Sequence, residues 1–271
     1  MTTPDIGAIA EALMGARRDG KALDPVAWQA AIPDMDAAYA VQAAVADAQG
    51  WFVRAAPRAW KSGGPSRSQV LTHAPLPPAG VRMSPADYGD MRFFAPLIEI
   101  EVALRLAQAV SAETAAALAS AAERADEAGR AELADRIADE LVDAMCVSIE
   151  VVDSRWADPA RATAPMKLAD LQSHGALALG AWVPYARRDW SAQRCEVTIG
   201  AAAPVARTGT HPLGSPTWLL PVWLKHATRS GAAVPDGTVV TTGAWAGMLP
   251  AQAGDEVTAA FEGIGSATVR I

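Results

Sequence analysis

The stretch FAPLIEIEVALRL, residues 94–106, alternates apolar and polar side chains and is the clearest strand signal in the chain. Side chains two residues apart on a strand point to the same side, so Glu99 and Glu101 share one face. The opposite face is apolar and holds Ile98, Ile100 and Val102. We therefore expect a strand that packs one face on the core and presents a pair of carboxylates on the other.

The pair of carboxylates allows two interpretations, a cation site or a solvated strand face. Two glutamates roughly 7 Å apart along a strand can converge on one cation if another segment adds a third oxygen donor. The alternative is a half-exposed strand whose charged face is simply solvated. Residues 147–153, VSIEVVD, favour the first reading, because Glu150 is a single carboxylate within a second apolar run. Glu99, Glu101 and Glu150 are thus candidate ligands of a hard cation such as Mg²⁺ or Mn²⁺.

The rest of the chain predicts an α+β fold. Residues 6–18 and 36–49 have helical patterns, and short β-like runs separated by proline and glycine follow Trp51. Residues 111–145, rich in Ala, Glu, Asp and Arg, predict one long helix or two shorter ones. Further elements are expected as a helix over 216–230 and as strands over 195–199, 237–242, 256–261 and 265–271. No linker divides the chain, so we expect a single domain, 1–271, with a mostly helical N-terminal part (1–80) and a β-rich core (81–271).

Composition narrows the class of protein. A chain of 271 residues with 51% apolar content can bury a substantial core. Its net charge of −7 and its lack of a basic stripe argue against nucleic acid as a partner. Apolar runs stop short of the roughly 18 residues that a membrane span needs, and no signal-peptide pattern is present, so a cytoplasmic location is expected. Cys146 and Cys195 form no C-x-x-C pair, which indicates neither a disulfide framework nor a thiolate metal site.

Several short motifs resemble one family of metal-dependent enzymes. P-L-I-E-I-E at 96–101 and I-E-V-V-D-S-R at 149–155 are similar to the paired signature of the 2-keto-4-pentenoate hydratase and 4-oxalocrotonate decarboxylase family, within the fumarylacetoacetate hydrolase-like superfamily. Further matches are D-Y-G at 87–89, H-P-L-G-S-P at 211–216, T-G at 242–243, G-D at 254–255 and G-I-G-S-A-T-V-R at 263–270. The resemblance extends over nearly the whole chain.

The resemblance implies a helical N-terminal part followed by a mixed β-barrel-like core, assembled as a homo-oligomer or in a complex with a sister decarboxylase or hydratase. It implies Mg²⁺ or Mn²⁺ bound by the three glutamates. Lys61, in W-K-S-G-G-P-S, matches the lysine that approaches the substrate, and Asp87 matches an aspartate implicated in proton transfer. Thr242, in the T-G motif, is a candidate substrate-binding residue.

The chain also departs from the family pattern. After Lys61 it reads Ser-Gly-Gly-Pro instead of Ile-Gly-Leu-Thr, which changes the backbone freedom of a pocket loop. Residues 169–175 read A-D-L-Q-S-H-G where the family reads A-D-N-A-S-S-G. Ser173 keeps a hydroxyl for a substrate carboxylate, and His174 replaces a serine, so both are candidate substrate contacts. The helical stretch between the two metal-binding segments also looks longer than the family's.

The function expected from this resemblance is metal-dependent hydration of a 2-hydroxy-2,4-dienoate, of the 2-keto-4-pentenoate type, to a 4-hydroxy-2-oxo acid. Decarboxylation of a 4-oxalocrotonate-like 2-oxo acid would use the same electron sink. A tautomerase or hydrolase of the same superfamily and a non-catalytic partner subunit are the remaining alternatives. The presence of all three glutamates, Lys61 and Asp87 argues against the partner subunit.

Overall fold

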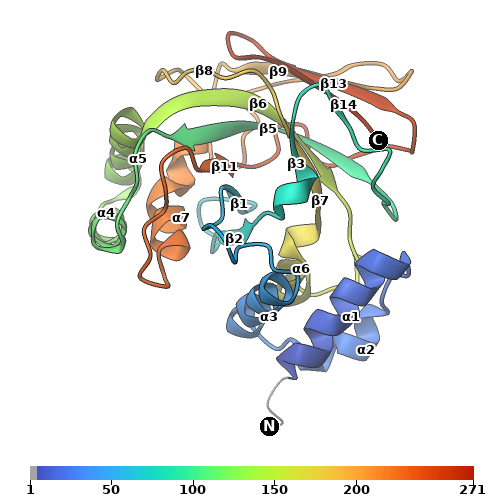
Figure 1. The fold of residues 1–271 in the computed structure, drawn as a ribbon. Helices are drawn as coiled ribbons and strands as arrows, with labels where there is room; N and C mark the ends of the chain where they lie inside the picture. Colours follow the sequence, from blue (N-terminus) through green and yellow to red (C-terminus); the bar gives the residue numbers. More distant parts are fainter. Residues whose placement is uncertain (1–4) are drawn as a thin grey trace.

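The computed structural model describes residues 5–271 (Figure 1). Its N-terminal part consists of the helices α1 (Ile6–Asp19), α2 (Pro25–Trp28) and α3 (Met35–Ala48). Each begins after an aspartate whose carboxylate accepts a hydrogen bond from a backbone N–H of the first turn, namely Asp5, Asp24 and Asp34. These side chains satisfy N–H groups that have no partner within the helix, which fixes where each helix starts.

A curved sheet of nine strands forms the centre of the molecule. Its main path runs β2-β1-β11-β5-β6-β7-β3, with β12 and β8 paired to β5 and β6. Figure 1 shows β5 and β6 arching over the shorter strands β1 and β2. The strands are β1 (Ala59–Gly63), β2 (Thr72–Pro75), β3 (Val81–Met83), β5 (Leu97–Leu106), β6 (Val142–Val152), β7 (His174–Leu179), β8 (Val183–Pro184), β11 (Val239–Thr241) and β12 (Leu249–Pro250).

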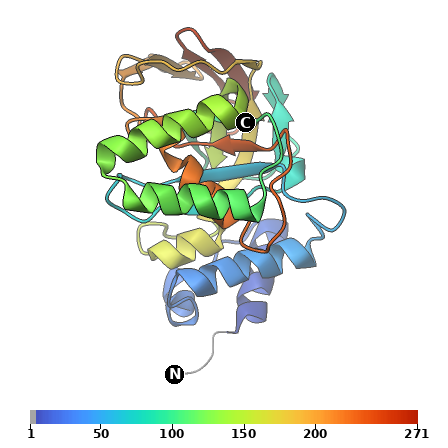
Figure 2. The same cartoon turned by 90° about the vertical axis from the view of Figure 1, so that its left-hand side faces the viewer.

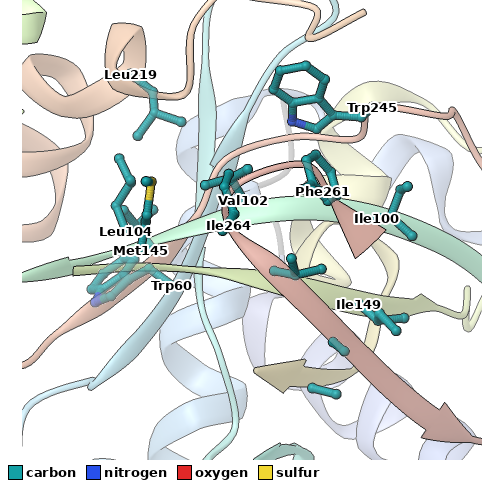
Figure 3. Close-up of a cluster of buried hydrophobic side chains, with 14 of the residues drawn as sticks. Trp60, Ile100, Val102, Leu104, Met145, Ile149, Leu219, Trp245, Phe261 and Ile264 are labelled. Carbon is teal, nitrogen blue, oxygen red and sulfur yellow. The ribbon is translucent and has the colours of Figure 1, made fainter. Parts of the chain in front are cut away.

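A second sheet of five strands packs on the convex side of β6. It consists of β10 (Val205–Thr208), β9 (Arg194–Ile199), β13 (Glu256–Phe261), β14 (Gly265–Arg270) and β4 (Ala86–Asp87). The apolar face of β5 is buried here, with Ile100 and Ile149 close to Trp245 and Phe261 (Figure 3). The predicted alternation of β5 is therefore confirmed, because one face lies in this core and the other faces the concave side.

Two helices join β5 to β6. The predicted helical stretch 111–145 is divided into α4 (Ala112–Arg124) and α5 (Glu127–Leu141), an antiparallel pair drawn in green in Figure 2. Our expectation was wrong for residues 142–145, which form the start of β6. Val142 pairs with Leu106 of β5, and ladder pairing outweighs local helix propensity at this point.

The other predicted elements are present with shifted bounds. Residues 216–230 form a 3₁₀ turn, Pro216–Leu219, followed by α7 (Leu220–Ala227). A short helix α6 (Ala164–Ala169) leads into β7. The N-terminal helices end at Ala48, and β1 and β2, although within residues 1–80, join the core sheet. The α+β architecture with a half-barrel core is confirmed, and none of the described helices is long and apolar enough to span a bilayer.

Candidate metal centre

Three glutamates from two neighbouring strands converge on the concave face of the large sheet. In the antiparallel pairing of β5 with β6, Glu99 lies opposite Glu150, and Glu101 lies opposite Ser148. One carboxylate oxygen from each glutamate lies within 4.8 Å of the other two. The structure thus brings together the three residues that the sequence predicted as ligands, and it is the one such group found among residues 5–271.

The carboxylate of Glu101 is anchored on one side by the last residue of β11 and by the backbone that follows the strand. Its Oε2 accepts hydrogen bonds from the hydroxyl of Thr241 and, at 2.7 Å, from the backbone N–H of Gly243. Thr241 Oγ1 is also 3.1 Å from Ser148 Oγ on β6. These bonds orient Glu101, which is a buried side chain, and leave its Oε1 for other partners.

The carboxylate of Glu150 has one satisfied oxygen and one unsatisfied oxygen. Oε1 accepts hydrogen bonds from Lys61 Nζ at 2.6 Å and from His174 Nδ1 at 2.9 Å. Oε2 is buried and has no hydrogen-bond partner among the described residues. Leaving a buried carboxylate oxygen without a partner costs free energy. A cation bound to Glu150 Oε2 would supply the missing partner.

The electrostatics of the cluster show a shortage of positive charge. Burial, together with the charges of Glu101 and Glu150, raises the pKa of Glu99 to about 8. Burial and the charge of Glu150 also raise the pKa of Glu101. For Glu150, burial is outweighed by Lys61 and His174, and its pKa is lowered. One ammonium therefore does not compensate three carboxylates, and the all-oxygen donor set fits Mg²⁺ or Mn²⁺.

Lys61 is placed at the cluster by β1, which pairs in parallel with β11. Its Nζ donates to Glu150 and, at 3.2 Å, to the carbonyl oxygen of Gln172. Burial alone would lower the pKa of Lys61, but the charge of Glu150, followed by those of Glu99 and Glu101, outweighs burial and raises it. Lys61 is therefore an ammonium at neutral pH, a donor of hydrogen bonds or of a proton.

A strained turn lies beside Lys61. Leu171, Gln172 and Ser173 have φ values of 52°, 55° and 60°, which places three consecutive non-glycine residues in the left-handed region. Such strain costs free energy and concentrates at functional sites. Gln172 presents its carbonyl to Lys61 and its side-chain amide to Thr72, while its Oε1 is buried without a described partner. Sequence reasoning missed Gln172, and the departure Leu-Gln from the family's Asn-Ala was the available signal.

His174 is fully buried and its ring contacts Glu150. Burial lowers the pKa of His174 despite the hydrogen bond to Glu150, so the imidazole is neutral. Because Nδ1 faces a carboxylate oxygen, Nδ1 carries the hydrogen and donates it. His174 Nε2 is buried and has no partner among the described residues. His174, predicted as a substrate contact, thus donates its hydrogen bond to Glu150, a candidate metal ligand.

The remaining predicted site residues have different surroundings. Thr242 donates its hydroxyl to the carbonyl oxygen of Val102 at 2.7 Å, a bond that ties β11 to β5. Ser173 lies in the strained turn, and its hydroxyl makes no hydrogen bond to another described residue. Asp87 is exposed on β4, the edge strand of the five-stranded sheet, and accepts a hydrogen bond from its own neighbour Gly89 at 2.8 Å. No hydrogen bond or ion pair within residues 5–271 joins Asp87 to the glutamates.

The raised pKa of Glu99 predicts a pH-dependent stability of the metal-free protein. Its value of about 8 lies above the ordinary 4.5, so the stabilisation is present below the ordinary value and is lost as pH rises through about 8. Glu101 acts in the same direction, whereas the contribution of Glu150, with its lowered pKa, is already complete at neutral pH. We expect the melting temperature of EDTA-treated protein to fall between about pH 5 and about pH 8.

Differential scanning fluorimetry at constant ionic strength measures this trend. Saturating Mg²⁺ should reverse the fall, because metal binding needs ionised carboxylates and becomes tighter as they lose their protons. The variant Glu99→Gln should flatten the metal-free curve. A melting temperature that rises over this pH window in the metal-free protein would contradict the assignment.

Comparisons with known proteins identify a family and a fold. The sequence profile of the family described as "Fumarylacetoacetate (FAA) hydrolase C-terminal" matches residues 98–271. Two structures of 4-oxalocrotonate decarboxylase from Pseudomonas putida G7 share the fold over 100% of this chain and 98% of theirs. The one complexed with calcium and acetate has 19% identity and a TM-score of 0.74, and the one complexed with magnesium and adipate has 18% and 0.76. A fumarylpyruvate hydrolase from Pseudomonas aeruginosa in complex with Mn²⁺ and pyruvate is 12% identical, with a TM-score of 0.53 over 80% of this chain and 89% of that one.

Proposed function

Because the chain belongs to the fumarylacetoacetate hydrolase family, we propose that it is a divalent-metal-dependent lyase that acts on a small 2-oxo or 2-hydroxydienoate acid. The observation that carries this proposal is the set of three converging carboxylates with an unsatisfied buried oxygen on Glu150 and a buried ammonium beside it. The structures with bound calcium, magnesium or manganese support the proposal through the fold that they share with this chain. Their sequence identity to it is below 20%.

Glu99, Glu101 and Glu150 would hold the metal, and Mg²⁺ or Mn²⁺ would supply stabilisation of the negative charge on the oxygens of a chelating 2-oxo acid. Lys61 is an ammonium at this centre that can donate a proton there. Its Nζ is held by Glu150 and by the carbonyl of Gln172, so the remaining N–H direction is available to a substrate. The strained turn that carries Gln172 fixes one of these two acceptors.

We propose hydration as the reaction. In 2-hydroxypenta-2,4-dienoate the 2-hydroxyl loses a proton while C5 gains one, which yields a 2-oxo-3-enoate. Water then adds its hydroxyl group at C4 and its proton at C3, which yields a 4-hydroxy-2-oxo acid. Lys61, as an ammonium, is suited to donate the proton that C5 gains, and the amine that results is suited to accept the proton that the 2-hydroxyl loses.

Decarboxylation is a second candidate, favoured by the position of Asp87. Hydration was expected to use Lys61 and Asp87 together, but Asp87 lies on the edge of the other sheet and bonds Gly89. Loss of CO₂ needs one proton donor, because the electron pair of the broken C–C bond passes into the 2-oxo unit and is protonated afterwards. The likeness of fold to 4-oxalocrotonate decarboxylase over the full chain is consistent with this alternative.

One assay distinguishes the candidates. EDTA-treated protein is given 2-hydroxypenta-2,4-dienoate or 2-hydroxymuconate, Mg²⁺ or Mn²⁺ is restored, and ultraviolet absorbance and released CO₂ are followed together. Metal-dependent loss of the dienol absorbance without CO₂ supports the hydratase. Loss with one equivalent of CO₂ from the dicarboxylate supports the decarboxylase, and no turnover of either acid contradicts both.

His174 should contribute to metal affinity through Glu150. The variant His174→Leu removes the donor to Glu150 Oε1, and we expect Mn²⁺ affinity to fall by about 10- to 100-fold, the usual effect of losing a group that orients a ligand. Calorimetric titration of Mn²⁺ measures it without any substrate. His174→Asn keeps an N–H near the position of Nδ1 and should recover most of the affinity. Equal losses for Leu and Asn would show that the hydrogen bond is not the cause.

A further inference from the structure

A small cavity lies at the end of the glutamate-bearing strands, outside the metal centre. Its volume is about 170 Å³, and its wall includes Arg17, Arg92, Arg155, Phe93, Phe94 and Asp153. Arg17 is in the last turn of α1, residues 92–94 lead toward β5, and Asp153 and Arg155 follow β6. None of the lining residues is a candidate metal ligand.

The three guanidinium groups have donors to spare. Arg155, only 2% exposed, uses Nε and Nη2 on the side chain and carbonyl of Asp170, at 2.5 and 3.1 Å. Its Nη1 lies 4.0 Å from Asp153 Oδ2, beyond hydrogen-bond reach. Arg17 donates from Nη2 to the carbonyl of His174 at 3.3 Å and is 3.7 Å from Asp170 Oδ1. The side chain of Arg92 donates no hydrogen bond to another described residue.

The charges around the cavity do not balance. Three arginines face two carboxylates, those of Asp153 and Asp170. Asp153 already accepts from the backbone N–H groups of Phe94 and Ala95, both at 2.9 Å. Burial, followed by the like charge of Arg155, lowers the pKa of Arg17 to about 9, while the charges of Asp170 and Asp153 act in the opposite direction.

The position of α1 explains part of this arrangement but not all of it. A helix C-terminus favours cations, and Arg17 lies in the last turn of α1. Arg92 lies against the C-cap Gly20, where an added Cβ would come within 2.5 Å of its Nη1. The dipole gives no reason for the buried Arg155 or for the two phenylalanines that line the same hollow.

We infer that this cavity is a binding site for a small carboxylate with an apolar body, separate from the metal centre. Guanidinium groups match a carboxylate in geometry and charge, and the rings of Phe93 and Phe94 suit an apolar group attached to it. The volume is below the roughly 300 Å³ at which pockets for drug-sized ligands begin, so the ligand is small. This inference does not depend on the proposed reaction.

Calorimetric titration of benzoate into the EDTA-treated full-length protein tests the site, because removal of the metal prevents binding at the glutamates. We expect saturable binding with one site per chain and weaker binding of acetate, which lacks the apolar body. Arg92→Ala and Arg17→Met should each weaken benzoate binding by about tenfold or more, the loss expected for a charge-assisted contact. Arg18→Ala is the matched control, since Arg18 is exposed on the same helix and pairs with Asp19.

Arg92→Ala carries the test if Arg17→Met folds poorly, because the side chain of Arg92 has no hydrogen bond to lose within residues 5–271. Circular dichroism and melting temperature establish that each variant is folded. No saturable binding by the wild-type chain would overturn the inference. Binding with unchanged affinity in Arg92→Ala and in a folded Arg17→Met would overturn it too.

Discussion

A Glu150→Gln variant is expected to lose measurable Mg²⁺ and Mn²⁺ binding and to lose activity by about a thousandfold or more, several kcal/mol of lost charge stabilisation. Glu150 Oε1 accepts from both Lys61 and His174, so only Oε2 is left for a metal. A glutamine has one oxygen to offer. If that oxygen stays with Lys61 and His174, the amide N–H₂ points at the metal, and a donor cannot coordinate a cation.

Calorimetric titration of Mn²⁺ into EDTA-treated protein measures the loss directly, with turnover as a second readout. The matched control is Glu196→Gln, an exposed glutamate on β9 of the other sheet, which should bind metal and turn over like the wild type. Native metal affinity and full activity in Glu150→Gln would exclude the three-glutamate site.

A Lys61→Met variant is expected to lose activity by about 10²- to 10⁴-fold, the usual contribution of a positioned proton donor, while it still binds metal. The methionine is close in length but has no proton to give, and Lys61 is not one of the carboxylate ligands. Separation of the two properties is the informative result, because loss of Glu150 removes both whereas loss of Lys61 removes only turnover. Single-turnover absorbance at saturating Mn²⁺ measures the rate, and calorimetry measures the metal.

Lys61→Arg should also be slow, because arginine keeps the charge beside Glu150 but does not release a proton at working pH. Full activity in Lys61→Arg would limit Lys61 to an electrostatic role. The control Lys225→Met removes an exposed lysine of α7 that pairs with Glu123, and it should leave both rate and metal binding unchanged.

The glutamate centre could be predicted because its signal is local. Alternation along 94–106 places Glu99 and Glu101 on one face whatever the strand pairs with, since the side-chain period of a strand is two. Glu150 required one more assumption, that two apolar strands lie side by side, and the pairing of β5 with β6 meets it. Lys61 came from the resemblance, and the parallel pairing of β1 with β11 places it at the cluster.

Asp87 and Thr242 also came from the resemblance, but motif membership does not specify what a side chain touches. Thr241 ends β11 and Thr242 follows it, and their side chains have different partners. The hydroxyl of Thr241 donates to Glu101, whereas that of Thr242 donates to the backbone of β5. Asp87 lies on the edge strand β4, and its carboxylate accepts a hydrogen bond from the backbone N–H of Gly89. Both stay candidate site residues as a prediction from sequence, and the structure shows other contacts for them.

The sequence alone therefore determined the α+β class and the two strands that carry the three glutamates, because periodicity and composition act over a few neighbouring residues. Only the tertiary structure decided that His174 orients Glu150, that a left-handed turn aims the carbonyl of Gln172 at Lys61, and that Arg17 reaches the His174 carbonyl. The last two contacts join residues 111 and 157 positions apart. Contacts of that range depend on how helices and sheets pack against one another, and no local pattern encodes that packing.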